Sequence, residues 1–331
     1  MRTPLSGLIA AAIASLAIIS GALAAPAHAE EAAHTEEGRP DPLLAFNHSW
    51  AMVDRETADA IEHSEYLGEF ADRRINTGND GTSTWTGRYL LGKETYLEFF
   101  GPGDAPDAVA GDTGLAVSAD DDGDLAVATD NLRKLGVVDP VEFTQVTDLG
   151  DGNPIPWFDV TYTTTDYDTF FSWAMEYRDE FLTDPRLSFP PAAYDGDVSR
   201  DRYNRDRYLD HQMRDIIGIQ IATTQADIDK MVPLWRAGGI TIRVLKDGGV
   251  LAFDGMTTIR LLPVPAEEAG VRHVIFALNE PAEEPQTETI GNSTLHVGPG
   301  AYALWTFDPI EPGATARSQG KGKPLHPTFG G

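Results

Sequence analysis

Hydrophobic and polar positions change their period along the chain in a repeating order. Alternation of apolar with small or polar residues over 113–119 predicts a half-buried strand. The residues that follow place Leu125, Ala128, Leu132 and Leu135 at i, i+3, i+7 and i+10, which is the spacing of one helical face. The pattern then returns to short strand-like runs. The sequence therefore predicts a unit made of a strand, a helix and several further strands.

Three such units follow one another, and strands without a helix come after them. The first unit begins with a strand over 43–53 and a helix that Asp54 caps, and it contains turn-forming residues over 75–81. The expected strands of this unit and the two following units are 82–91, 95–100, 113–119, 141–147, 157–164, 169–177, 216–223, 240–245, 250–253 and 257–264. The strands expected without a helix are 271–278, 294–297 and 301–307. A helix covers only one face of a small sheet, so neighbouring units are expected to pair, and the concave side of the joined sheets is the natural place for a ligand.

The N-terminal residues follow a targeting pattern. Arg2 is followed by an apolar stretch and by Ala27-His28-Ala29, which is an A-x-A cleavage sequence. This pattern predicts a secretory signal peptide over 1–29, cleavage after Ala29 and a secreted protein. An uncleaved membrane anchor is the alternative, which the acidic sequence after Ala29 disfavours. No later segment approaches the length of a membrane span, so no stable membrane insertion is expected after cleavage.

Charge and cysteine content exclude several classes of function. The 331 residues carry a formal net charge of -27, from 25 Lys+Arg against 52 Asp+Glu, so nucleic acid is not an expected partner. The absence of cysteine excludes disulfides, cysteine metal sites and thiol nucleophiles. A hydrophobic fraction of 41% is enough for a packed core.

Several segments resemble a known superfamily. The sequences FNHSWAMVD, YLEFFGP, GLAVSADD and LAVATDNLRKLG are similar to those of the glyoxalase or vicinal-oxygen-chelate superfamily, over residues 43–165 and more weakly over 214–264. Within it, FNHSW, TGRYL and GNSTL resemble a group of secreted bacterial proteins of uncharacterised activity. The resemblance implies an α+β fold of repeated βαβββ modules, with paired, curved mixed sheets that form a cup. The expected organisation is a signal peptide (1–29), a disordered leader (30–41), a module pair (42–165), an insert or lid (166–213), a third module with extra strands (214–307) and a disordered tail (308–331).

The resemblance also implies a metal site for part of its motif. His48 matches the first-strand ligand and Glu98 matches the carboxylate ligand of the first module, whereas the second module has Thr113 or Gly114 at the ligand position. Arg260 occupies the position of Glu98 in the third unit, where it would repel a metal or bind a substrate carboxylate.

Imidazole and carboxylate are normal ligands of divalent Fe, Mn, Zn or Ni, and a facial triad needs a third ligand. The candidates for the third ligand are Glu176 and His211. The alternative is a partly buried His48 bonded to Glu98 without a metal. Trp50 differs from His48 by two positions, so both side chains are expected on one strand face, with Trp50 as a candidate ligand contact.

Two other polar clusters have simpler explanations. Asp120, Asp122 and Asp124 alternate, but Leu125 stands where a calcium loop needs glycine, so helix capping is the better interpretation. The segment 166–213 is rich in Tyr, Arg and Asp, and one hypothesis makes it a lid whose Tyr203 contacts the ligand. The alternative is a surface helix with ion pairs such as Arg202–Asp206 at i, i+4.

Three functions remain compatible with these observations. The first is an exported protein that binds a small molecule in the cup without demonstrated chemistry. The second is a lyase, isomerase or dioxygenase that depends on a divalent metal held by His48 and Glu98. The third is a cell-surface interaction module that uses the Tyr/Arg segment.

Overall fold

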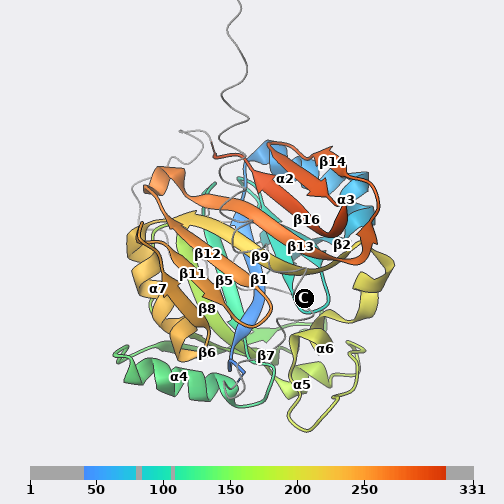
Figure 1. The fold of residues 1–331 in the computed structure, drawn as a ribbon. Helices are drawn as coiled ribbons and strands as arrows, with labels where there is room; N and C mark the ends of the chain where they lie inside the picture. The colour runs from blue at the N-terminus through green and yellow to red at the C-terminus, as the bar shows by residue number, and fades with distance from the viewer. Residues whose placement is uncertain (1–40, 80–83, 106–108, 311–331) are drawn as a thin grey trace, which may run out of the picture. The chain divides into compact units, whose positions relative to one another are not determined.

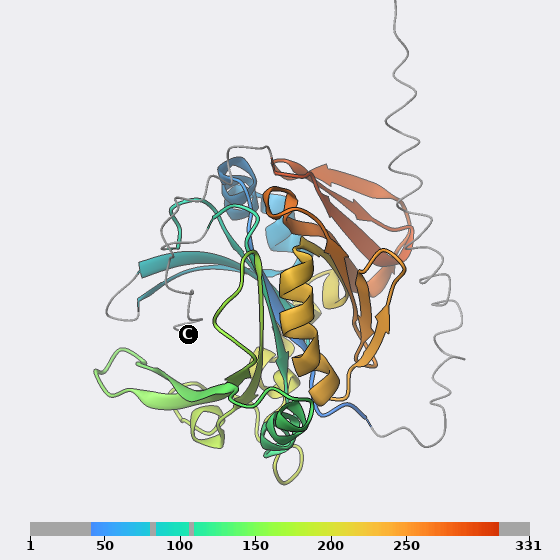
Figure 2. The same ribbon diagram turned by 90° about the vertical axis from the view of Figure 1, so that its left-hand side faces the viewer.

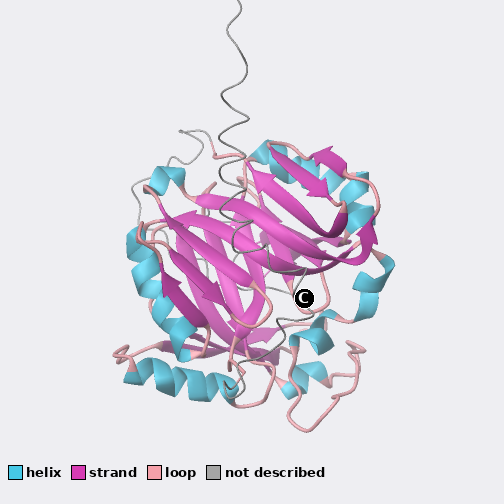
Figure 3. Cartoon of the chain, viewed as in Figure 1, coloured by secondary structure: helices cyan, strands magenta, loops and turns pink. Residues whose placement is uncertain are grey.

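Two eight-stranded mixed sheets form the framework of the protein. The computed structural model describes residues 41–79, 84–105 and 109–310, and the fold is that of the unit beginning at Pro42. The strand orders are β2-β3-β4-β1-β5-β8-β7-β6 and β10-β11-β12-β9-β13-β16-β15-β14. Figure 1 shows the orange strands of the second sheet in front of the blue and green strands of the first, and Figure 3 separates helices from strands. The predicted α+β class is confirmed. The predicted signal peptide, and nearly all of the predicted leader and tail, lie outside the described residues.

The first module is a βαβββ unit with one broken helix. Its elements are β1 (Ala45–Met52), α2 (Arg55–His63), α3 (Glu65–Phe70), β2 (Asp72–Asn79), β3 (Thr84–Leu91) and β4 (Tyr96–Phe100). The Asp54 side chain accepts from the Thr57 N–H at 2.8 Å and caps α2, as expected. Ser64 ends α2 and caps α3, so two short helices are present where the sequence predicted one. The turn expected over 75–81 is wrong for residues 75–79, which belong to the edge strand β2.

The second module repeats this order and joins the first. Its elements are β5 (Thr113–Ser118), α4 (Asp124–Lys134), β6 (Val141–Thr147), β7 (Ile155–Tyr162) and β8 (Phe170–Tyr177). The first and last strands of each module pair in parallel, and β1 pairs antiparallel with β5 to form one continuous sheet. Because β8 completes this module, the segment between the two sheets begins at Arg178 rather than at 166. It contains α5 (Asp179–Leu182), α6 (Arg200–Asn204) and the 3-10 helix η2 (Asp206–Asp210).

The second sheet contains two modules, of which the second has no α-helix. The first consists of β9 (Met213–Thr223), α7 (Gln225–Ala237), β10 (Thr241–Val244), β11 (Val250–Phe253) and β12 (Thr258–Pro263). After η3 (Ala266–Glu268), the other consists of β13 (Gly270–Ala282), β14 (Gln286–Thr289), β15 (Ser293–Val297) and β16 (Gly300–Phe307). Without a helix to return the chain, β13 pairs antiparallel with β16, whereas the matching strands of the other modules are parallel. The extra strands predicted near the C-terminus are therefore a fourth module.

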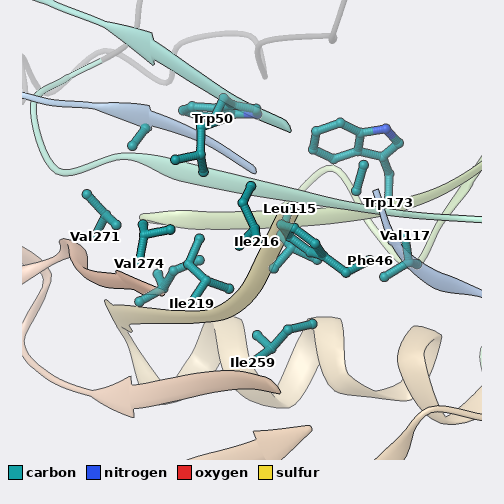
Figure 4. Close-up of a cluster of buried hydrophobic side chains, with 14 of the residues drawn as sticks. Phe46, Trp50, Leu115, Val117, Trp173, Ile216, Ile219, Ile259, Val271 and Val274 are labelled. Carbon is teal, nitrogen blue, oxygen red and sulfur yellow. The ribbon is translucent and has the colours of Figure 1, made fainter. Parts of the chain in front are cut away.

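The core lies between the two sheets. Helix α7 contacts β8 of the first sheet and β10 and β12 of the second, and Figure 2 shows this gold helix between the two sets of strands. Figure 4 shows Leu115 and Phe46 of the first sheet facing Ile216, Ile219 and Ile259 of the second. All five side chains are buried, so the central part of this face of the first sheet is occupied by packing against the second sheet. No helix of the described residues is both long and apolar enough to cross a bilayer.

Candidate functional site

A β-bulge at Asn47 aims His48 away from the core. Phe46 pairs with Val117 and His48 pairs with Ala116, so Asn47 is the extra residue of the bulged strand. Strict alternation would place Phe46 and His48 on the same face. The bulge instead turns Phe46 toward the second sheet and His48 toward the opposite, cup face of the first sheet.

Glu98 shares the cup face with His48. The His48 ring stacks on Tyr96 of the neighbouring strand β4, with 4.2 Å between the centroids. Glu98 lies two residues after Tyr96 and pairs with Trp50 of β1, so the side chains of Tyr96, Glu98, His48 and Trp50 point to one face. Phe99 points the other way and packs on Trp305 of the second sheet. The sequence-based expectation that Trp50 and His48 share a face is confirmed by this register.

Burial leaves both ionisable groups neutral near pH 7. Only 1% of His48 and 1% of Glu98 is exposed to solvent. Burial lowers the pKa of His48 to about 3, because the charged imidazolium has no water to solvate it. The same cause raises the pKa of Glu98 to about 8, and the Tyr89 hydroxyl opposes this shift. The base of the cup is therefore a neutral imidazole beside a protonated carboxyl group.

The bulge residue also fixes the tautomer of the imidazole. His48 Nδ1 lies 2.7 Å from Asn47 Oδ1. An amide oxygen only accepts, so Nδ1 carries the proton and donates it. The Asn47 amide nitrogen donates to Ser118 Oγ at 2.9 Å, which fixes the orientation of the amide. The imidazole is thus held by a chain of hydrogen bonds inside the first sheet.

The other predicted ligands do not join this pair. Glu176 lies on the opposite face of β8, where it accepts from the N–H groups of Gly123 and Leu125 at the start of α4. His211 lies at the end of η2, 3.2 Å from the carbonyl oxygen of Glu69. Arg260 lies on β12 of the second sheet. Among the described residues, no group of three or more His, Asp or Glu side chains is placed to hold a metal ion. The predicted third ligands of a facial triad therefore do not lie with His48 and Glu98.

The segment Arg178–Gln212 covers the cup face through buried arginines. Arg200 is 5% exposed and donates to the carbonyl oxygen of Phe46 at 2.5 Å and to Asp120 at 2.8 Å. Arg202 is also 5% exposed and donates to the carbonyl oxygens of Asp197 and Pro190. The alternative of a surface helix with an Arg202–Asp206 pair is wrong at these positions, because α6 ends at Asn204 and both arginines hold the segment from inside.

A cavity of about 160 Å³ lies between the segment and the first sheet. The first sheet lines it with Arg74, Asn76, Tyr89, Leu91, Tyr96 and Trp157. The segment lines it with Phe181, Leu187, Phe189, Tyr203, Asn204 and Arg205. Glu98 stands opposite Tyr89 in the strand register, and His48 lies under Tyr96, so the neutral pair supports the wall of this cavity.

Sequence reasoning identified part of this wall. Of the three ligand contacts it predicted, Tyr203 lines the cavity and stacks on Tyr177 at 4.2 Å. Trp50 lies on the cup face but packs on Gly114, where an added Cβ would lie 2.0 Å from the indole nitrogen. Arg74 also lines the cavity but was not singled out from the sequence. Its position beside Tyr89 becomes visible only with the pairing of β2 with β3.

The fold and cavity together define a class. This is an α+β protein of paired modules in which one concave sheet face and one inter-module segment enclose a small cavity. The chain belongs to the family described as "Family of unknown function (DUF5829)", which matches residues 46–307. No curated protein matches the chain.

Solved structures show distant likeness only. A hypothetical protein from Staphylococcus aureus has a TM-score of 0.46 and 12% identity, covering 81% of this chain and 100% of that one. A xylose isomerase-like TIM barrel/4-hydroxyphenylpyruvate dioxygenase fusion protein has a TM-score of 0.41 and 11% identity, covering 76% of this chain and 40% of that one. Catechol 2,3-dioxygenase has a TM-score of 0.40 and 11% identity, covering 80% and 87%. At these values the likeness is no basis for an activity.

Proposed function

We propose that this protein is an exported small-molecule-binding protein on a glyoxalase-like fold, and that its ligand occupies the cavity between the first sheet and the segment Arg178–Gln212. The observation that carries the proposal is the cavity itself, which has an aromatic wall from each side. Ligand sites of this kind are concave, mostly apolar and furnished with a few polar groups. Export rests on the signal-peptide pattern of residues 1–29.

The volume limits the ligand to one ring with small substituents. A cavity of roughly 150 Å³ in a protein core is enough to bind benzene, and this one is about 160 Å³. The segment that closes it is connected to the first sheet through Arg200 and through the stacked rings of Tyr203 and Tyr177. The segment acts as a lid that opens to admit the ligand.

Binding is tested by titrating single-ring compounds, both charged and neutral, into the purified protein by calorimetry. Leu91→Trp fills the cavity from β3, and we expect it to abolish binding; Leu209→Trp, at a position 61% exposed, is the matched control and retains binding. A bound ring should also slow amide hydrogen exchange in residues 178–212. The proposal fails if the wild-type protein binds no ring compound, or if Leu91→Trp binds as the wild type does.

The metal-dependent alternative has a separate test. Metal analysis of the untagged protein, with His48→Ala beside it, reports whether a divalent ion is held in the cup. Stoichiometric metal that is lost in the variant would replace the binding proposal with the enzyme hypothesis. The interaction-module alternative has less support from the segment, because its Arg200, Arg202 and Tyr208 are buried in the protein's own contacts.

A further inference from the structure

The cavity that we propose as the ligand site has two arginines at its wall. Arg74 comes from β2 of the first sheet and Arg205 comes from the segment that covers it. Their charges act on the groups around the cavity: Arg74 contributes to lowering the pKa of Arg205, after burial and Arg207. Burial raises the pKa of Tyr203 to about 12, and both arginines oppose this rise. Two cations from different parts of the fold therefore converge on one small space.

The two arginines differ in how their charge is balanced. Arg74 forms an ion pair with Asp72, with 2.6 Å between Nη2 and Oδ2. Arg205 donates from Nη2 to the carbonyl oxygen of Leu187 at 2.6 Å and lies 4.4 Å from the centroid of the Phe189 ring. In the part of the chain that the structure describes, no carboxylate forms an ion pair with Arg205. The sequence holds 52 acidic residues against 25 basic ones, so an arginine without an acidic partner is not explained by a shortage of acids.

The backbone at Arg205 is strained as well. Its φ is 68° and its ψ is -179°, a region that is nearly restricted to glycine. Strain of this kind is concentrated at sites that bind ligands, where the surrounding structure holds the residue in place. Here Arg205 ends α6 and precedes η2, and the turn between them presents its side chain to the cavity.

We propose that the ligand is a single-ring aromatic carboxylate, whose carboxylate pairs with Arg205 and is also attracted by Arg74. This inference rests on the proposed function of the cavity. The planar guanidinium matches the geometry of a carboxylate and can form two parallel hydrogen bonds to it. The aromatic walls, of which Tyr96, Trp157 and Phe181 are examples, receive the ring. Because His48 and Glu98 behind the wall are neutral, the uncharged ring is expected to lie toward them. The carboxylate is expected to lie at the arginines.

Benzoate and its neutral analogue benzamide separate the two proposals. We expect the wild-type protein to bind benzoate at least tenfold more tightly than benzamide at low ionic strength, and this preference to shrink as salt is added. Arg205→Gln should weaken benzoate binding at least tenfold and leave benzamide binding unchanged. Arg74→Gln should weaken benzoate binding less, because Asp72 already balances part of the Arg74 charge. Arg243→Gln, an exposed arginine on the second sheet, is the control and should change neither affinity.

Each outcome decides one proposal. Equal affinities for benzoate and benzamide in the wild type overturn the carboxylate proposal while the binding function stands. This comparison uses only the wild-type protein, so it does not depend on whether a variant folds. Unchanged benzoate affinity in Arg205→Gln, with the fold verified by circular dichroism, overturns it as well. Failure of both probes and of every other ring compound counts against the binding function itself.

Discussion

Replacing Glu98 with glutamine tests the electrostatics of the cup. The carboxyl group has an ordinary pKa of 4.5 and a pKa of about 8 in the folded protein. An acid whose pKa is raised on folding stabilises the fold fully at low pH, and this stability is lost as the pH rises from 4.5 to about 8. One unit of pKa difference corresponds to about 1.4 kcal/mol. The difference of 3.5 units therefore amounts to about 5 kcal/mol as an upper figure at pH 8 and above.

His48 has the opposite pH dependence. Its pKa falls from 6.5 to about 3 on folding, so the unfolded chain takes up a proton first and stability is lost as the pH falls from 6.5 toward 3. Between pH 4.5 and 6.5 the two contributions change by equal amounts in opposite directions. The sum of the two contributions to the free energy of unfolding is therefore independent of pH in this window. In Glu98→Gln only the contribution of His48 remains, so the stability of this variant rises with pH.

Urea unfolding at pH values from 4.5 to 8.5, followed by tryptophan fluorescence, measures the effect. We expect Glu98→Gln to gain stability over the wild type with rising pH, by about 1.4 kcal/mol per unit until pH 8. Glu283→Gln removes an exposed carboxylate and should show no comparable rise. A Glu98→Gln variant that is less stable than the wild type at pH 8, or a difference that does not depend on pH, would refute the assignment of a buried, protonated Glu98.

Two further predictions concern the segment and the junction between the sheets. Arg205→Gly should be more stable than Arg205→Ala by about 1 kcal/mol. The reason is that glycine relieves roughly 2 kcal/mol of backbone strain, which exceeds the stability lost through the entropy that glycine adds to the unfolded chain. A higher midpoint of thermal unfolding for the alanine variant would contradict the strain. Asp227→Ala should cost about 3–5 kcal/mol, because Asp227 accepts from the buried N–H groups of Thr169 and Phe170 and its loss leaves them without this partner. Asp229→Ala, exposed on the same helix, should change the unfolding free energy by less than about 0.5 kcal/mol, and similar values for the two variants would count against the Asp227 network.

The module order could be predicted because it depends on local patterns. The helical spacing of Leu125, Ala128 and Leu132 and the strands around it are properties of short stretches, and these elements form close to their predicted bounds. Leu135 of the same predicted face is the exception, because it lies just after the helix and is 55% exposed. The edge strand β2 was predicted as a turn because Asn76 and Gly78 favour turns. An edge strand tolerates such residues, since half of its backbone groups need no partner strand.

The arrangement of the site depends on contacts that are distant in sequence. The bulge at Asn47 carries no glycine or proline to mark it, and its existence follows from the pairing of β1 with β5. Arg200 and Arg202 read as surface residues because charged side chains usually are. Their partners, the carbonyl oxygens of Phe46 and Asp197, are backbone groups that no sequence pattern identifies.

The strand order of the second sheet has a consequence for biosynthesis. β16 is the last strand of the described residues, yet it lies inside the sheet between β13 and β15. While the ribosome is still making this strand, β13 and β15 each expose a row of unpaired N–H and C=O groups, which is a template for aggregation. A stop codon shortly before Gly300 would therefore open the middle of the sheet instead of trimming its margin. Until β16 fills this gap, the exposed edges of β13 and β15 can pair with strands of another nascent chain.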